Sequence, residues 1–183
     1  MRFKIFLLIL FVNFTSCNNS KKNSTINSTS KNVTTIDLQK QIDDCENQLQ
    51  ISVPKLTDLK KHPRLIDTNK KEWKQVGNHK LIWTSGFYPG VLWYAYEVTG
   101  NERWKTEAIK RTEVFEDFKN ITEHHDIGFM MFPAYGKGFE IGNIKEYKDI
   151  LLTSAASLAS RFNPNVGTIR SWSNKMHPRW KQH

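Results

Sequence analysis

Hydrophobic positions from residue 83 onward follow two helical patterns that alternate along the chain. Residues 91–96 are apolar on every side, which is typical of a helix buried all round. A second helix is predicted over residues 102–118, with its apolar side chains in one stripe among charged ones. The stripe consists of Trp104, Ala108, Thr112, Phe115 and Phe118. This second helix is therefore expected to be half exposed to water.

The same two patterns return further along the chain. Residues 127–135 are again apolar nearly all round, and residues 145–162 are again amphipathic. The apolar face of the latter comprises Tyr147, Leu151, Leu152, Ala155, Leu158, Ala159 and Phe162. Between the two, Gly136, Gly138 and Gly142 are expected to break the chain. Fully apolar helices that alternate with striped ones predict two layers of antiparallel hairpins, as in a double-layered α/α barrel. An α-solenoid is the competing architecture, although no fixed-length repeat supports it.

The segments outside these helices are less regular. Residues 36–51 have a modest helical pattern, and Pro54 and Pro63 indicate a loop after it. Residues 167–172 lack a helical period and are expected to be extended. The sequence therefore predicts an all-α fold with about five helices.

The first residues indicate export. Arg2 and Lys4 precede an apolar run over residues 5–12 that is too short to span a bilayer. The following residues 14–17 resemble the lipobox of bacterial lipoproteins, in which Cys17 would be lipidated and become the mature N-terminus. Phe14 stands where that motif usually has Leu, and an ordinary signal peptide cleaved nearby is the alternative.

Three regions follow from this interpretation. Residues 1–17 form a lipoprotein signal segment, residues 18–35 a polar flexible tether, and residues 36–183 the folded domain. The predicted location is the bacterial cell envelope, with a lipid anchor in the membrane and the domain facing the periplasm.

Composition changes this picture only slightly. The net charge of +9 comes from Lys and Arg residues that are scattered along the chain. No zinc-ligand spacing, RNA-binding signature or basic helix accompanies them, so nucleic acid is not a predicted partner. A basic surface suits an acidic substrate such as a uronate-bearing sugar. With Cys17 lipidated, Cys45 would have no partner, and no disulfide framework is expected.

The richest chemistry lies in residues 120–133. There Asp126 follows His124 and His125 and precedes an apolar wall. Burying an unpaired polar group costs roughly 2–7 kcal/mol, so such a carboxyl group needs a hydrogen bond or a proton. Carboxyl groups in apolar surroundings tend to have raised pKa values, as general acids require near neutrality. The alternative is that Asp126 serves only as a helix N-cap.

Five ordered blocks resemble glycoside hydrolase family 88, the unsaturated glucuronyl hydrolases. They are residues 83–87, 90–93, 124–129, 157–162 and 169–172. The resemblance implies an (α/α)6 barrel of twelve helices, of which this chain would be the incomplete N-terminal part. It also implies action on the 4,5-unsaturated uronic acid at the non-reducing end of lyase-generated oligosaccharides. The family hydrates the vinyl ether of that sugar and uses no metal or organic cofactor.

The resemblance also implies roles for particular residues. Asp126 falls on the first of the two acidic catalytic residues of the family. Trp83, Phe87, His125 and Trp172 fall on positions that line the sugar subsite. For each of these four, a place in the core or at a cap is the alternative interpretation.

The second family acid is expected soon after Trp172, but no carboxylate follows Asp149. The sequence therefore predicts a truncated chain without activity of its own. Two alternatives stay open. One is a lipid-anchored sugar-binding remnant without catalysis, and the other is an unsaturated rhamnogalacturonyl hydrolase.

Overall fold

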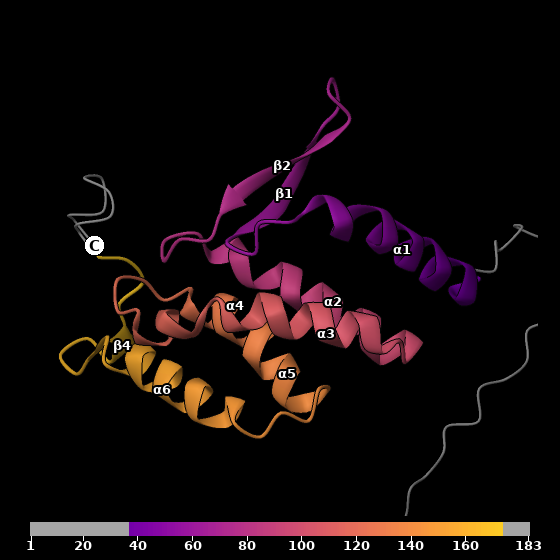
Figure 1. Cartoon of the computed structure of the whole chain (residues 1–183). Coiled ribbons are helices and arrows are strands. Elements are labelled where there is room, and N and C mark those ends of the chain that lie inside the picture. The colour runs from indigo at the N-terminus through magenta and orange to yellow at the C-terminus, as the bar shows by residue number, and fades with distance from the viewer. Residues whose placement is uncertain (1–36, 174–183) are drawn as a thin grey trace, which may run out of the picture. The chain divides into compact units, whose positions relative to one another are not determined.

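The computed structural model describes residues 37–173, and Figure 1 shows how their elements are arranged. The helices are α1 (Leu38–Ser52), α2 (Phe87–Thr99), α3 (Glu102–Glu113), α4 (Ile127–Met131), α5 (Lys137–Glu140) and α6 (Tyr147–Ala159). The strands are β1 (Lys61–Asp67), β2 (Glu72–Gly77), β3 (Phe162–Asn163) and β4 (Thr168–Ile169). The predicted signal segment, tether and lipidation residue Cys17 lie outside the described residues. Within residues 37–173, no helix has the length and apolar character needed to cross a membrane.

Helices α2 and α3 form an antiparallel hairpin because of the two residues between them. Gly100 has φ +66°, a left-handed conformation that glycine adopts without steric cost, and its N–H donates to Tyr96 O at 2.8 Å. Asn101 then caps α3, since its side chain accepts from the N–H of Arg103 at 3.1 Å. The two helices lie side by side in Figure 1. Helix α3 ends at Glu113, five residues earlier than predicted, and a 3-10 turn covers residues 116–120.

Two buried tryptophans connect the helices. The indole N–H of Trp93 on α2 donates to the Thr112 hydroxyl on α3 at 3.1 Å. The indole N–H of Trp104 on α3 donates to the Glu46 carboxylate on α1 at 2.8 Å. Both tryptophans are fully buried, so each couples apolar burial to a hydrogen bond that satisfies its only polar atom. The predicted helix over residues 36–51 is thereby confirmed as α1 and fixed to the hairpin.

The helices predicted to be buried all round are buried on one side only. On α2, Val91, Tyr94 and Val98 are exposed, and Phe129 and Phe132 are exposed on the α4–α5 run. The prediction of all-round burial is wrong within residues 37–173, because the described elements leave these side chains about half exposed. The stripe predicted over residues 145–162 is also largely uncovered. Helix α6 ends at Ala159 and Phe162 lies on β3, and the exposed members of the stripe are Leu152, Ala155, Ala159 and Phe162.

Gly136 and Gly138 do not break the chain as predicted, whereas Gly142 lies in a bend after the helical run has ended. A π-helical turn over residues 132–136 joins α4 to α5, so the helical run continues through Gly136 and Gly138 to Glu140. An added Cβ at Gly142 would lie 2.6 Å from Cζ3 of Trp93, and one at Gly138 would meet the Tyr147 ring. Close packing therefore favours glycine at both positions, inside α5 at Gly138 and in the bend after it at Gly142.

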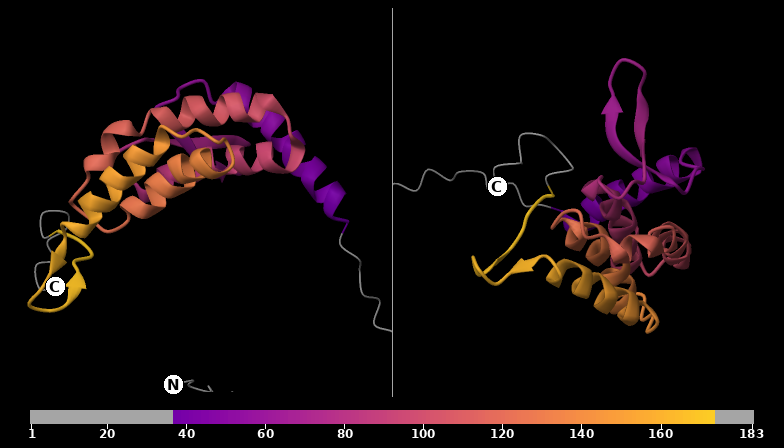
Figure 2. Two further views of the ribbon diagram at one scale, coloured as in Figure 1. Left: turned by 90° about the horizontal axis from the view of Figure 1, so that it is seen from below. Right: turned by 90° about the vertical axis from the view of Figure 1, so that its left-hand side faces the viewer.

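Two hairpins lie outside the helical layers. In the segment predicted as a loop, β1 and β2 pair antiparallel, and the Asp67 carboxylate accepts from the N–H groups of Asn69 and Lys70 in their turn. Figure 1 and the right-hand view of Figure 2 show that β1–β2 projects from the helices. The short β3–β4 hairpin and the bridge at Trp172 confirm the predicted extended segment from Thr168 on, whereas Gly167, with φ +67°, lies in the turn.

Candidate active site

Asp126 lies at the start of α4 but does not cap it with its side chain. Its φ of −77° and ψ of 3° place it just before the first helical residue, Ile127, and no side-chain capping bond forms. Its carboxylate Oδ1 instead lies 3.2 Å from Nε2 of His125. Asp126 is 7% exposed, whereas the His125 side chain is 42% exposed. The pair therefore joins a buried carboxylate to an imidazole that solvent or a ligand can reach.

The second imidazole, His124, is buried behind this pair. Its Nε2 lies 2.6 Å from the Lys80 carbonyl oxygen, and its Nδ1 lies 3.1 Å from the backbone nitrogen of Asp126. A carbonyl can only accept, and a backbone N–H can only donate. The two contacts thus assign the hydrogen to Nε2 and leave Nδ1 as an acceptor. His124 is a neutral hydrogen-bonding group in this arrangement, and its 3.9 Å separation from the Asp126 carboxylate is not an ion pair.

Trp172 reaches the site from the far end of the described chain. Residues 171–173 run antiparallel to residues 123–125: the N–H of His125 donates to Ser171 O at 2.8 Å, and the N–H of Ser173 donates to Glu123 O at 2.9 Å. The Trp172 ring lies edge-on to His125, with 5.2 Å between ring centroids. The structure therefore brings three predicted site residues together, namely His125, Asp126 and Trp172.

The other two predicted site residues belong to an exposed aromatic cluster. Trp83 begins a 3-10 turn and Phe87 begins α2, and their ring centroids are 5.7 Å apart. Phe129 on α4 completes the cluster, at 5.8 Å from Trp83 and 6.3 Å from Phe87. Phe129 ends one of the five sequence blocks and belongs to the predicted apolar wall, but it was not among the predicted site residues. Its position one helical turn after Asp126 is the signal that could have assigned it to the same side of α4.

Arg161 is a residue to which the sequence analysis gave no role. Its guanidinium Nε donates to Arg170 O at 2.8 Å, and its Nη1 donates to Thr122 O and, at 3.4 Å, to the Ser173 hydroxyl. It therefore ties the segment with Trp172 to the segment with Asp126. Burial lowers the pKa of this guanidinium from its usual value. Nothing in a local pattern could reveal the role of Arg161, because its three partners are distant in sequence.

The surroundings of the site carry further charge. The Lys80 ammonium pairs with the Glu123 carboxylate and lowers the pKa of that carboxyl group.

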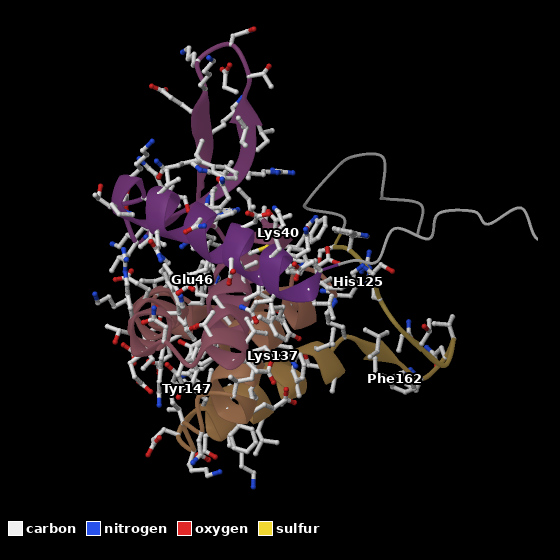
Figure 3. The ribbon with its side chains drawn as sticks, turned by 90° about the vertical axis from the view of Figure 1, so that its right-hand side faces the viewer. Lys40, Glu46, His125, Lys137, Tyr147 and Phe162 are labelled. Atoms are coloured by element: carbon white, nitrogen blue, oxygen red, sulfur yellow. The ribbon has the colours of Figure 1, made fainter. Side chains whose placement is uncertain are left out.

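A cavity of about 1000 Å³ adjoins Trp172 and is lined by residues of the segment 161–172, including Arg170. In the view of Figure 3, His125 lies on the side of the β3–β4 hairpin, which carries Phe162, and Tyr147 lies at the opposite side.

Comparisons with known proteins bear on this site. No model of a protein family matches the chain. The chain is 41% identical over 91 residues to the unsaturated glucuronyl hydrolase of Formosa agariphila, a match that covers 49% of this chain and 23% of that protein. The chain resembles the unsaturated glucuronyl hydrolases. The resemblance that the five sequence blocks predicted is thereby confirmed over about half the chain.

Solved structures of unsaturated glucuronyl hydrolases share the arrangement of these helices. The structure of one specific for heparin matches with a TM-score of 0.66 at 31% identity, over 74% of this chain and 35% of that one. A mutant from Streptococcus agalactiae, complexed with dGlcA-GalNAc6S, matches with a TM-score of 0.58 at 26% identity, over 68% and 32%. The chain thus spans about a quarter to a third of the length of these relatives. The described helices have the fold of one part of an unsaturated glucuronyl hydrolase.

Proposed function

We propose that this chain supplies one side of the active site of a glycoside hydrolase that acts on 4,5-unsaturated uronic acid. The sugar would be the non-reducing end of oligosaccharides left by polysaccharide lyases. The observation that carries the proposal is the contact between the buried Asp126 carboxylate and the accessible His125 imidazole, beside the Trp172 ring. The name of the Streptococcus agalactiae complex supports the ligand class, since dGlcA-GalNAc6S is a disaccharide of the predicted kind.

The reaction proposed is hydration of the vinyl ether in the unsaturated sugar. A proton is added to C4 and the hydroxyl of a water to C5, while the second hydrogen of the water leaves as a proton. The resulting hemiketal opens the ring, and the hemiacetal left at C1 then breaks down to release the rest of the oligosaccharide. In this proposal Asp126 and His125 hydrogen-bond the sugar, and the exposure of the His125 side chain supports this role for the imidazole. Trp83, Phe87 and Trp172 offer aromatic faces on which sugar rings pack, and the net charge of +9 favours an acidic ligand.

We further propose that the chain alone is an incomplete (α/α)6 barrel. The exposed apolar side chains of α2 and of the α4–α5 run support this, because neighbouring apolar side chains on a helix normally pack against another element. A sugar-binding remnant without catalysis is the second candidate function, and the retained subsite residues Trp83, Phe87, His125 and Trp172 fit it. An unsaturated rhamnogalacturonyl hydrolase is the third.

The first prediction is that the 183-residue chain alone shows no turnover of unsaturated disaccharides. The physical reason is that general acid–base chemistry needs a proton donor and a group that activates water, and only one family carboxylate has a counterpart. Loss of the absorbance of the double bond measures the reaction. Turnover near about 1 per second would contradict the prediction, since that rate is typical of complete enzymes. Saturable binding without turnover fits both the incomplete hydrolase and the sugar-binding remnant.

The second prediction concerns the cell envelope, where we propose that Cys17 carries a lipid. The chain without substitutions should become labelled when it is expressed in a bacterium that is given a fatty acid with a clickable group. Cys17→Ala should abolish the label, and Cys45→Ala should leave it unchanged as the matched control. Equal labelling of the Cys17→Ala chain would rule out the lipobox interpretation and leave the ordinary signal peptide as its replacement.

A further inference from the structure

A single buried imidazole contacts all three segments that carry the candidate site residues. His124 is 1% exposed, so it is not a group that a sugar can reach in the described part of the chain. Its contacts are the Lys80 carbonyl, the Asp126 backbone and the Trp172 ring. The roles proposed above use its neighbour His125 and leave His124 without a function.

The contact with Lys80 holds the middle of the segment that leads to Trp83. The Nε2–H group of His124 donates to Lys80 O over 44 residues of sequence. The two ends of this segment are held separately by another buried histidine, His62, whose ring nitrogens lie 2.9 Å from Asn78 Oδ1 and 3.2 Å from Thr84 Oγ1. His124 and the Lys80–Glu123 ion pair thus both connect the middle of this segment to the segment with Asp126, and His124 does so through the backbone carbonyl of Lys80.

The contacts with Asp126 and Trp172 lie on the other side of the same ring. The N–H of Asp126 donates to Nδ1, which resembles the local turn that an Asn side chain forms with the N–H two residues on. This bond satisfies the backbone N–H of Asp126. It therefore fixes the backbone to which the Asp126 side chain is attached. The Trp172 ring stacks on His124 with an interplanar angle of 24° and 6.1 Å between centroids.

We propose that His124 is a positioning residue that holds Trp83, Asp126 and Trp172 in one arrangement without touching the sugar. The inference deepens the proposed function and rests on it for the identity of the ligand. It requires the hydrogen of the neutral ring to be on Nε2, since a hydrogen on Nδ1 would remove the acceptor for the Asp126 N–H. Nitrogen-15 spectra of the imidazole in the 183-residue chain should therefore show a protonated Nε2 and an unprotonated Nδ1. The reverse assignment would overturn the proposal.

Two substitutions separate the contacts. His124→Asn keeps an acceptor near the Nδ1 position but cannot reach Lys80 O, whereas His124→Gln keeps a donor near the Nε2 position. Amide hydrogen exchange of the 183-residue chain is the measurement. His124→Asn should accelerate exchange in residues 80–83 and at the amides of His125 and Ser173 by at least about tenfold, with α3 unchanged. His124→Gln should restore slow exchange in residues 80–83.

A matched control removes the other buried histidine. His62→Asn should accelerate exchange at Asn78 and in the β1–β2 hairpin but leave the amides of His125 and Ser173 as they are. An equal acceleration in α3 for His124→Asn would show a general loss of stability and overturn the positioning role. No acceleration in residues 80–83 would overturn it as well.

A binding measurement then separates this inference from the proposed function. The probe is the disaccharide dGlcA-GalNAc6S, titrated into the 183-residue chain and the His124→Asn variant. Because a less ordered site binds more weakly, the variant should lose affinity by a factor on the order of five or more. If the unmodified chain does not bind the probe, the proposed sugar site fails, while the exchange data still decide the positioning role. Equal binding by both chains would show that His124 does not position the ligand groups.

Discussion

Asp126→Asn is expected to lower kcat/KM by about 100-fold or more in an active enzyme, which corresponds to roughly 2.7 kcal/mol. Asparagine has the shape of aspartate but lacks the negative charge and the exchangeable carboxyl proton. A helix cap needs only an oxygen acceptor, so Asn would serve equally well there. The structure favours the catalytic role over the cap, because the Asp126 side chain forms no capping bond and contacts His125 instead.

The experiment needs an enzyme that turns over. We would use a hybrid in which residues 37–173 replace the corresponding segment of the Formosa agariphila relative. Asp126→Asn should leave the Tm of this hybrid within a few degrees, and loss of double-bond absorbance would report kcat/KM. Asp149→Asn, an exposed aspartate on α6, is the matched control and should leave kcat/KM unchanged. Full activity of the Asp126→Asn hybrid would show that Asp126 has no catalytic or substrate-fixing role.

The hybrid also distinguishes the candidate functions. Activity of the unmodified hybrid on unsaturated glucuronyl disaccharides would support the proposed hydrolase. Activity confined to unsaturated galacturonyl–rhamnose disaccharides would favour the rhamnogalacturonyl hydrolase. A hybrid that folds and binds the disaccharide but does not turn it over would favour the sugar-binding remnant.

The helices could be predicted from local patterns, and their burial could not. The link at Gly100 and Asn101 depends on two residues whose conformations are local, so the α2–α3 hairpin follows directly from the sequence. Whether Val91 or Tyr94 is covered depends on which other elements are present. An apolar surface shows that a helix has a strong tendency to be covered, but it does not show that a partner exists.

The β1–β2 hairpin escaped prediction for a different physical reason. Both strands leave most of their side chains exposed, so no alternation of apolar and polar residues marks them. Their turn depends on the Asp67 carboxylate and on Lys71 at φ +54°, a left-handed conformation that non-glycine residues seldom adopt. Pro63 further obscured the pattern, because proline within a run argues against a central strand.

In the candidate site, too, contacts between neighbours in sequence could be predicted and contacts between distant segments could not. The neighbours His125 and Asp126 could be identified as a pair because they are adjacent in sequence. The pairing of residues 171–173 with residues 123–125, and the role of Arg161 in holding them, depend on contacts between distant segments. The family resemblance predicted that Trp172 belongs to the sugar subsite, and the proposal that it does still depends on the binding experiment.

The core offers the second large expected effect: Trp93→Ala should destabilise the 183-residue chain by about 3–5 kcal/mol. Trp93 is fully buried, and the backbones of Gly138 and Gly142 pack against its ring, so no neighbouring side chain there can fill the space. The variant also leaves the Thr112 hydroxyl without the indole donor. Trp73→Ala on β2, where the indole is 36% exposed, is the matched control and should cost less than about 1 kcal/mol. Urea unfolding followed by circular dichroism measures both, and equal costs would show that Trp93 is not central to the core.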